Sequence, residues 1–410
     1  MGNINNIELL SPAGDSECLQ SALDFGADAV YLAGKKFGMR TSSANFDTDN
    51  LRDSVKKAHD KGVKVYLTCN TVARNGDIDE LPEFLEQAQD CGVDAFIIAD
   101  IGVMSLAQKY APKVHIHIST QAGIANYQTA NVFYNMGAKR VVLARELSLE
   151  EIAELHAKVP NELEIEAFVH GSMCVSFSGR CLMSSYMTGR DANLGDCAQP
   201  CRWKYYIYEP NREGQFFPIL PDDNGTYLFN SRDLCMIEHI PELVNAGVTS
   251  LKIEGRAKSS YYTAVITNAY RHAIDDYRLC GSNDYKVAEW ILEEMEKVSH
   301  REYNTGFFFG KEPGQIHSNG GYIRNYEVVA VCGGFEDGAA YITQRNRFFK
   351  GDLLDVLPPG GKPFNITVNE MFDEYGQAVD VAPHAMQKLK MLSDTVIPKG
   401  SLLRKKLNKA

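Results

Sequence analysis

The sequence predicts an α/β protein: a (β/α)8 TIM-like barrel with a cysteine-bearing insertion after its seventh strand, followed by a small all-β barrel domain. Three observations support this fold class. Short apolar runs alternate with helix-like segments between residues 7 and 251, at the interval that a (β/α) unit needs. Five of these runs directly follow a glycine that ends a helix-like segment. Beyond residue 326, short alternating runs separated by turn residues replace this rhythm.

Eight apolar runs are the expected barrel strands. Near-continuous apolar runs are typical of parallel strands buried on both faces, and glycine suits the left-handed C-cap of the helix before each strand. An open doubly wound sheet is the alternative, which the count of eight makes less favourable. The runs are residues 7–10, 27–31, 63–66, 93–96, 114–118, 138–141, 163–168 and 248–251, and the glycines are Gly26, Gly62, Gly92, Gly137 and Gly247.

Helix-like segments lie between these strands, and the sequence divides into a barrel at 1–310, a linker at 311–325 and a β domain at 326–410. The insertion occupies 170–235, and we expect a small antiparallel element within it at 202–208 and 226–229. We expect helices at 16–23, 50–59, 81–89, 102–110, 129–135, 149–156, 259–277 and 287–298, and β-domain strands at 327–331, 339–343, 353–357, 364–368 and 401–404.

Composition indicates a soluble cytoplasmic protein. No stretch approaches eighteen uncharged apolar residues and no secretory signal opens the chain, so we expect no membrane segment and reduced cysteines. The net charge of −11 argues against indiscriminate nucleic-acid binding. The basic run Arg404-Lys405-Lys406 with Lys409 is, by default, a solvated tail.

Four of the ten cysteines fall in one loop, at Cys174, Cys181, Cys197 and Cys201. The loop follows the seventh strand, and in barrels such loops form the face that carries chemistry. Zinc sites usually come as two close pairs, whereas the gaps here are six, fifteen and three residues. An iron–sulfur cluster accepts wider spacing because each thiolate binds a different iron. The spacing favours a cluster and leaves zinc as the alternative.

Polar residues at the expected strand ends predict a pocket at the same face of the barrel. Each alone has a plainer explanation as a helix cap. His115 and His117 share a strand face and could bind a metal, but core packing is the preferred interpretation. The strand-end set is Ser11, Asn70, Asp100, Thr120, Gln121, Arg145, Glu166, His170, Glu254 and Arg256.

The segment 166–184, which contains Gly-Ser-Met-Cys174 and Ser-Gly-Arg-Cys181, resembles the signature of the collagenase-like peptidase family. Supporting phrases stand at 8–14, 26–31, 186–190, 230–234 and 252–256. The C-terminal segment resembles the small β-barrel of the family branch that acts on tRNA. The resemblance covers nearly the whole chain.

The resemblance implies a tRNA-modifying enzyme that hydroxylates the wobble uridine to 5-hydroxyuridine. It implies a [4Fe–4S] cluster on Cys174, Cys181, Cys197 and Cys201, with Cys235 as the alternative fourth ligand. Prephenate, or a small carboxylate like it, is implied as the source of the hydroxyl oxygen. Relatives hydroxylate a ribosomal RNA cytidine or act in oxygen-independent ubiquinone synthesis.

The resemblance suggests roles for the pocket residues. Guanidinium groups suit carboxylates, although about half of the cations are expected to pair with Glu166, Asp233 or Glu254 instead. Trp203, Tyr205 and Tyr206 could stack on a base that has left its stack, or pack in a core. The expected catalytic residues are Glu166, His170, Arg145 and Glu254, and the expected substrate-binding residues are Arg190, Arg232, Lys252, Arg256, Asn70 and Gln121.

Two other functions stay open at this point. The family name suggests a peptidase, but the sequence shows no nucleophile with its base and no zinc-protease helix. A non-catalytic iron–sulfur scaffold that delivers electrons is the third interpretation. A protein partner or a homo-oligomer is compatible with each of them.

Overall fold

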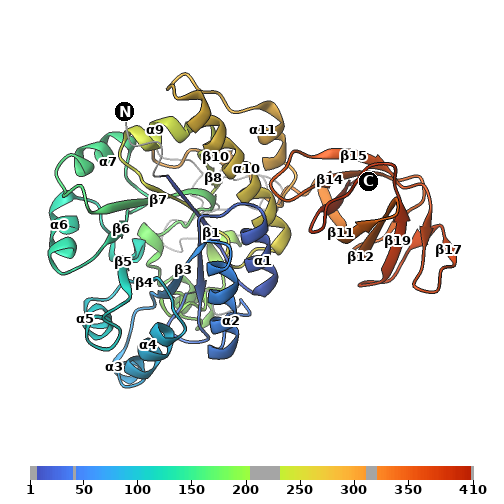
Figure 1. Ribbon diagram of the computed structural model, residues 1–410. Coiled ribbons are helices and arrows are strands. Elements are labelled where there is room, and N and C mark those ends of the chain that lie inside the picture. The colour runs from blue at the N-terminus through green and yellow to red at the C-terminus, as the bar shows by residue number, and fades with distance from the viewer. Residues whose placement is uncertain (1–6, 40–42, 204–230, 311–320, 408–410) are drawn as a thin grey trace, which may run out of the picture.

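The computed structural model describes residues 7–39, 43–203, 231–310 and 321–407. Its N-terminal part is a barrel of parallel strands surrounded by helices, and its C-terminal part is an antiparallel all-β domain (Figure 1). The predicted fold class is confirmed. The expected linker lies mostly outside the described residues, as does most of the expected antiparallel element at 202–208 and 226–229.

Eight parallel strands close the barrel, because β9 pairs with both β1 and β7. This closure excludes the open doubly wound sheet. The strands are β1 (Glu8–Pro12), β2 (Ala29–Ala33), β3 (Lys64–Cys69), β4 (Ala95–Ile98), β5 (His115–Ile118), β6 (Arg140–Val142), β7 (Glu164–Ser172) and β9 (Ser250–Ile253).

The helices lie on the outside of the barrel, and the glycine signal is confirmed at all five positions. Gly26, Gly62, Gly92, Gly137 and Gly247 have φ between 73° and 100°, the left-handed conformation that ends the preceding helix. The main helices are α1 (Ser16–Asp24), α2 (Thr48–His59), α4 (Leu81–Asp90), α5 (Ile101–Tyr110), α6 (Tyr127–Asn135), α7 (Leu149–His156), α9 (Ile240–Asn245), α10 (Ser260–Cys280) and α11 (Glu289–Met295).

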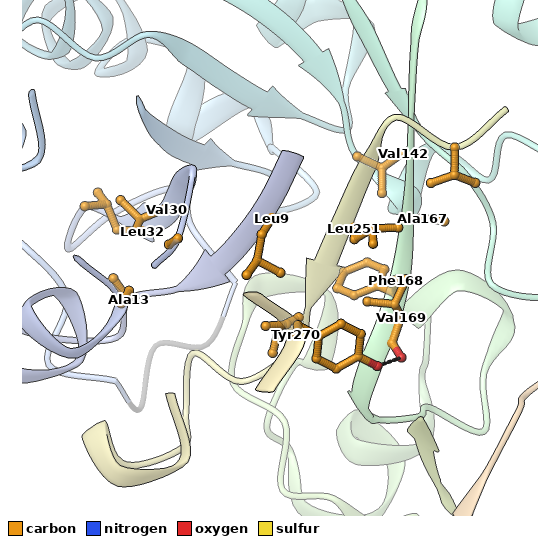
Figure 2. Packing of buried hydrophobic residues seen from close by; sticks show 14 of the residues in the cluster. Leu9, Ala13, Val30, Leu32, Val142, Ala167, Phe168, Val169, Leu251 and Tyr270 are labelled. Carbon is orange, nitrogen blue, oxygen red and sulfur yellow. Dashed lines mark hydrogen bonds between the residues drawn. The ribbon is translucent and has the colours of Figure 1, made fainter. Parts of the chain in front are cut away.

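Alternation along the strands separates two environments. Leu9, Val30 and Leu251 belong to the large apolar core between the strands and the helices, where Tyr270 of α10 donates a hydrogen bond to the Val169 carbonyl at 2.8 Å (Figure 2). The neighbouring Leu10 and Tyr31 belong to a separate, smaller cluster. Since successive side chains of a strand point to opposite faces, this second set fills the barrel interior.

The end of β7 extends beyond the barrel, which the sequence did not predict. Its last residues pair antiparallel with β8 (Asp233–Cys235), and β8 pairs with β10 (Tyr303–Asn304). Two short helices, α3 (Asn75–Ile78) and α8 (Met183–Thr188), lie in loops. The β7 extension fixes the point at which the cysteine-bearing segment leaves the barrel.

The C-terminal domain contains the five expected strands and several others. Its larger sheet has the order β15-β14-β20-β11-β12-β19-β16-β17, and β13 pairs with β18. The strands are β11 (Tyr326–Glu336), β12 (Ala339–Gln344), β13 (Phe348–Phe349), β14 (Leu353–Leu357), β15 (Phe364–Thr367), β16 (Met371–Phe372), β17 (Ala378–Val379), β18 (Val381–Ala382), β19 (Lys388–Leu392) and β20 (Leu402–Lys406).

A buried ion-pair network joins this domain to the barrel. Arg404 of β20 lies 2.7 Å from Glu294 of α11 and 2.9 Å from Asp355 of β14, and Lys297 lies 2.7 Å from Asp355. Burial lowers the pKa of Lys297, but the carboxylates of Glu294 and Asp355 more than offset this, so its net pKa is raised. The prediction of a solvated basic tail was wrong for Arg404, which is fully buried. Lys409 lies outside the described residues.

Across the described ranges, no helix combines the length and the apolar character that crossing a membrane would require.

Candidate functional site

One pocket opens at the carboxyl ends of the barrel strands, where it meets the cysteine-bearing segment. Strand residues Thr68, Ile97 and Phe168 form part of its wall, and residues of the segment 172–202 form its rim. The pocket has a volume of about 190 Å³, which exceeds the space needed for a single water. The cysteine segment and the strand-end residues therefore contribute to one site.

All four cysteines of the insertion line this pocket. Cys174 is exposed, and Cys181, Cys197 and Cys201 are partly buried. Burial and the charges of the other three cysteines raise the pKa of Cys201 to about 11, against the lowering effect of Arg202. Cys174, Cys181 and Cys197 thus lie near enough to Cys201 to affect its pKa.

The backbone around three of the sulfurs points N–H groups at them. Ser176 N donates to Cys174 Sγ at 3.4 Å, Met183 N to Cys181 Sγ at 3.3 Å and Gln199 N to Cys197 Sγ at 3.3 Å. Each donor lies two residues after its cysteine. Such hydrogen bonds stabilise sulfur in its charged form, and hydrogen bonds to sulfur are among the features that tune iron–sulfur centres.

The donor set fits a metal centre in its chemistry, since four thiols surround one cavity. Among the described residues, however, no three or more His, Cys, Asp or Glu side chains are grouped closely enough to hold a single ion. Cys235, the alternative fourth ligand, does not line the pocket in the described part of the chain. Cys235 lies opposite His170 in the antiparallel pairing of β7 with β8, and burial raises the pKa of the Cys235 thiol to about 12.

Three predicted cations line the pocket wall. Arg145 donates to the Ser172 carbonyl at 3.1 Å, and its guanidinium carbon lies 3.9 Å from the centre of the Phe168 ring. Lys252 is buried beside the Tyr31 ring, 4.5 Å from its centre. Arg256 is buried as well, and its backbone is in such close contact with Gly14 that a Cβ there would lie 2.0 Å from the Arg256 carbonyl oxygen.

A neutral polar wall stands on the β3–β5 side of the same pocket. It contains Thr68, Asn70, Thr120 and Gln121. Asn70 accepts a hydrogen bond from Met39 N at 3.1 Å, and Thr120 donates to the Leu143 carbonyl at 2.8 Å. In the described structure, both polar atoms of the buried Gln121 side chain lack a hydrogen-bond partner. A buried unpaired amide is costly, which makes Gln121 a good candidate for ligand binding.

Glu166 lies beneath the pocket, inside the barrel. It accepts from Lys252 Nζ at 2.6 Å and from Arg140 Nη1 at 3.1 Å, and it is fully buried. Its expected position at a strand end was wrong, because β7 continues to Ser172. Glu166 therefore holds Lys252 in place from below and does not itself line the pocket in the described structure.

His170 also lies away from the pocket lining. Its ring is buried against Tyr270 and Tyr303, at centroid distances of 5.6 and 5.3 Å. Burial lowers the pKa of His170 to about 3, so the ring is neutral near pH 7. This is the environment of a packed core histidine. His117 is likewise buried, 4.6 Å from the Tyr66 ring, whereas His115 is exposed.

The remaining predicted residues divide between the pocket and the surface. Glu254 lines the pocket and accepts a hydrogen bond from Tyr31 Oη at 3.3 Å. Arg190 lies 2.7 Å from Asp196, and Arg232 lies 3.2 Å from Glu302. Neither arginine lines the described pocket. These partners differ from Glu166, Asp233 and Glu254, which were expected to pair with about half of the cations; Lys252 does pair with one of them, Glu166.

Three residues outside the predicted catalytic and substrate-binding set organise the site. Arg140 connects Glu8, Glu164 and Glu166 inside the barrel. Glu146 accepts from Ser178 N at 2.7 Å and from Ser178 Oγ at 3.0 Å, which ties the cysteine segment to the loop after β6. Arg202 donates to the Met173 carbonyl at 2.6 Å. Inward-facing alternation could have identified Arg140, but no local pattern signals the other two contacts.

The family models match both parts of the chain. The model described as Peptidase family U32 matches residues 14–318, and the model described as Peptidase family U32 C-terminal domain matches residues 324–404. The chain belongs to peptidase family U32. The resemblance to the collagenase-like peptidases is thereby confirmed. One family model covers both the barrel and the cysteine segment.

Relatives in the U32 family carry two kinds of name. The chain is 36% identical to tRNA hydroxylation protein P1 of Bacillus subtilis, over 97% of this chain and 94% of that protein. It is 35% identical to tRNA hydroxylation protein P of Escherichia coli, over 92% and 91%. It is 32% identical to a collagenase of Porphyromonas gingivalis, over 76% of each. Family membership alone therefore does not distinguish a role in RNA modification from a role in proteolysis.

Proposed function

We propose that this U32 protein hydroxylates tRNA, converting the wobble uridine to 5-hydroxyuridine with the help of a [4Fe–4S] cluster and an oxygen-donating small carboxylate such as prephenate. Two relatives that match more than nine-tenths of the chain are named as tRNA hydroxylation proteins. The observation that carries the proposal is the meeting of four cysteines with Arg145, Lys252 and Arg256 in one pocket.

The cysteines supply the redox part of the proposal. Hydroxylating a ring carbon is chemistry that amino-acid side chains do not perform alone, and a bound cluster would supply electron transfer. Cys174, Cys181, Cys197 and Cys201 would hold it. The sequence spacing of the cysteines, with gaps of six, fifteen and three residues, suits a cluster, in which each thiolate binds a different iron, better than a tetrahedral zinc ion. Zinc is the alternative that metal analysis distinguishes.

Each of the two walls of the pocket would bind a different ligand. Arg145, Lys252 and Arg256 form the cationic wall, which suits the carboxylates of a small oxygen donor. Gln121 and Thr68 stand on the neutral wall, where an amide and a hydroxyl can pair with the polar edge of a uracil ring. The ion pair with Glu166 orients Lys252, which lines the pocket.

The peptidase alternative has less support from the site. Among the described residues, no histidine lines the pocket, so none of its serines has a histidine base beside it there. Because one relative is named a collagenase, the experiments below also test for peptidase activity. A non-catalytic iron–sulfur scaffold would share the cysteines but would not need the cationic wall.

Nucleoside mass spectrometry tests the proposed function. Deleting the gene should remove 5-hydroxyuridine and its derivatives from tRNA, and restoring the wild-type gene should return them. A Cys174→Ala gene should fail to restore them, and an Arg190→Gln gene should restore them because Arg190 is exposed and paired with Asp196. Unchanged tRNA after the deletion would refute the proposal, and gelatin or collagen cleavage by the pure protein would favour the peptidase.

A further inference from the structure

Exposed apolar side chains are concentrated in the segment that carries the four cysteines. Of the eighteen large hydrophobic residues that are exposed in the described structure, six fall within residues 174–203. This segment also carries the four cysteines that line the pocket. We call these six residues the apolar rim: Val175, Phe177, Leu182, Tyr186, Met187 and Trp203. Concentrated exposure of this kind marks an interaction surface, whereas singly scattered apolar residues do not.

A strained turn holds Phe177 in place. The next residue, Ser178, has φ 47°, a left-handed conformation that is uncommon outside glycine. Both hydrogen bonds from Ser178 go to the Glu146 carboxylate, so the barrel fixes the turn. The ring of Phe177 lies over Gly123, where an added Cβ would stand 3.6 Å from it, yet the residue is 55% exposed. Strain of this kind is typical of functional sites.

Tyr186, in α8, is also exposed on an anchored backbone. The helix is tied to the fourth-cysteine loop, because Ser184 Oγ accepts a hydrogen bond from Ala198 N at 2.9 Å. Tyr186 is nevertheless 83% exposed. The rings of Phe177 and Tyr186 are thus both exposed to solvent, and a hydrogen bond anchors the backbone near each of them. Rigid anchoring lowers the entropy that a binding partner must overcome.

The charge beside these rings favours an anionic partner. Arg180, which lies between Phe177 and Tyr186 in the sequence, is exposed, and no carboxylate pairs with it in the part of the chain that the structure describes. The segment 174–203 contains three arginines and two aspartates, a net charge of +1, in a chain whose net charge is −11. Exposed aromatic rings with an unpaired arginine are the features by which proteins bind unpaired nucleotides.

We propose that the apolar rim binds single-stranded RNA, with nucleotides next to the target base stacked on Phe177 and Tyr186 and a phosphate held by Arg180. This inference rests on the proposed function only in taking RNA as the substrate. A base must leave its stack to enter the pocket, so its neighbours lose a stacking partner. The rings of Phe177 and Tyr186, on the segment whose Ser178 and Met183 line the pocket, would replace that partner. A protein docking on the rim would not need a ring beside the pocket.

Fluorescence anisotropy with a labelled RNA hairpin tests the proposal. Phe177→Ala and Tyr186→Ala should each weaken binding to the single-stranded loop by about 5- to 150-fold, as expected for loss of one stacked base. Phe177→Tyr should bind like the wild type, because the ring is kept. Tyr375→Ala is the matched control, since Tyr375 is 81% exposed in the C-terminal domain, and it should bind normally. Arg180→Gln should lower the salt dependence of binding.

The outcomes separate this proposal from the proposed function. Circular dichroism checks that each variant is folded, and a blunt duplex of the same stem should bind the wild type and the alanine variants alike. Equal loop affinity of the wild type and the Phe177→Ala, Tyr186→Ala double variant would overturn the rim proposal, while tRNA hydroxylation could still hold. Rim variants that abolish self-association or protein binding, but not RNA binding, would also overturn it.

Discussion

The Lys252 ammonium group lies 2.6 Å from the Glu166 carboxylate, and both side chains are buried inside the barrel. Lys252 also faces the pocket, whereas Glu166 does not in the described structure. This relationship connects the buried charges of the barrel to the surface on which the proposed carboxylate would bind.

Replacing Glu166 by Gln should strongly destabilise the protein. The substitution leaves Arg140 and Lys252 buried with one carboxylate fewer, and breaking a buried pair from one side costs about 3–5 kcal/mol. Urea denaturation should show this loss in the free energy of unfolding. Glu154→Gln, which removes an exposed pair with Lys158, should show almost none. Equal effects of the two substitutions would contradict the assigned role of Glu166.

His117 should make stability depend on pH. Burial, and then the charges of Arg140 and Lys252, lower the pKa of His117 well below its ordinary value of 6.5. As pH falls below about 6.5, the unfolded chain binds a proton that the folded protein does not. The free energy of unfolding should therefore fall with decreasing pH, by at most about 1.4 kcal/mol per pH unit from this residue.

The His117→Phe variant provides the comparison for this pH dependence. Its free energy of unfolding should decline less between pH 6.5 and pH 5 than that of the wild type. Any change in the free energy of unfolding that is the same at both pH values cancels, because each protein is compared with itself at pH 6.5 and pH 5. Parallel pH profiles would show that His117 is not the group responsible.

Gln121→Met should separate stability from activity. The substitution removes two unpaired buried polar atoms, so the free energy of unfolding should rise by about 1 kcal/mol. If the amide binds the base, tRNA hydroxylation should fall in the same variant. A thermal melt and nucleoside analysis measure the two effects. A stabilised variant with full activity would remove Gln121 from the site.

Arg404→Met should loosen the attachment of the C-terminal domain. It leaves Glu294 buried without Arg404, and we expect the free energy of unfolding to fall by about 3 kcal/mol or more. Limited proteolysis should then cut faster between the two parts of the chain. Arg345→Gln, which removes an exposed pair with Glu17 across the same junction, should behave like the wild type. Equal cleavage of both variants would contradict this account.

The sequence predicted the barrel well because its signals are local. A glycine such as Gly92 adopts a positive φ, and the buried strand after it, Ala95–Ile98, is apolar. The β7 extension and the pairing of β8 with β10 depend on contacts between distant segments, which no local pattern carries. Arg404 illustrates the same limit, since a basic run looks solvated until Glu294 and Asp355 are placed beside it.

The site was predictable to a similar degree. Spacing identified the four cysteines, and strand ends identified Asn70, Gln121, Arg145, Glu254 and Arg256, all of which line the pocket. The position of Glu166 was wrong because the end of β7 could not be read from the sequence. The clamp of Glu146 on Ser178 was missed because it joins two loops.

Iron and sulfide analysis of protein purified without oxygen tests the central claim most directly. The account predicts about four irons and four sulfides per chain, with absorbance near 400 nm, and their loss in a Cys174→Ala variant that stays folded. Protein that contains zinc, or no metal, when it is isolated and handled under nitrogen would contradict the account.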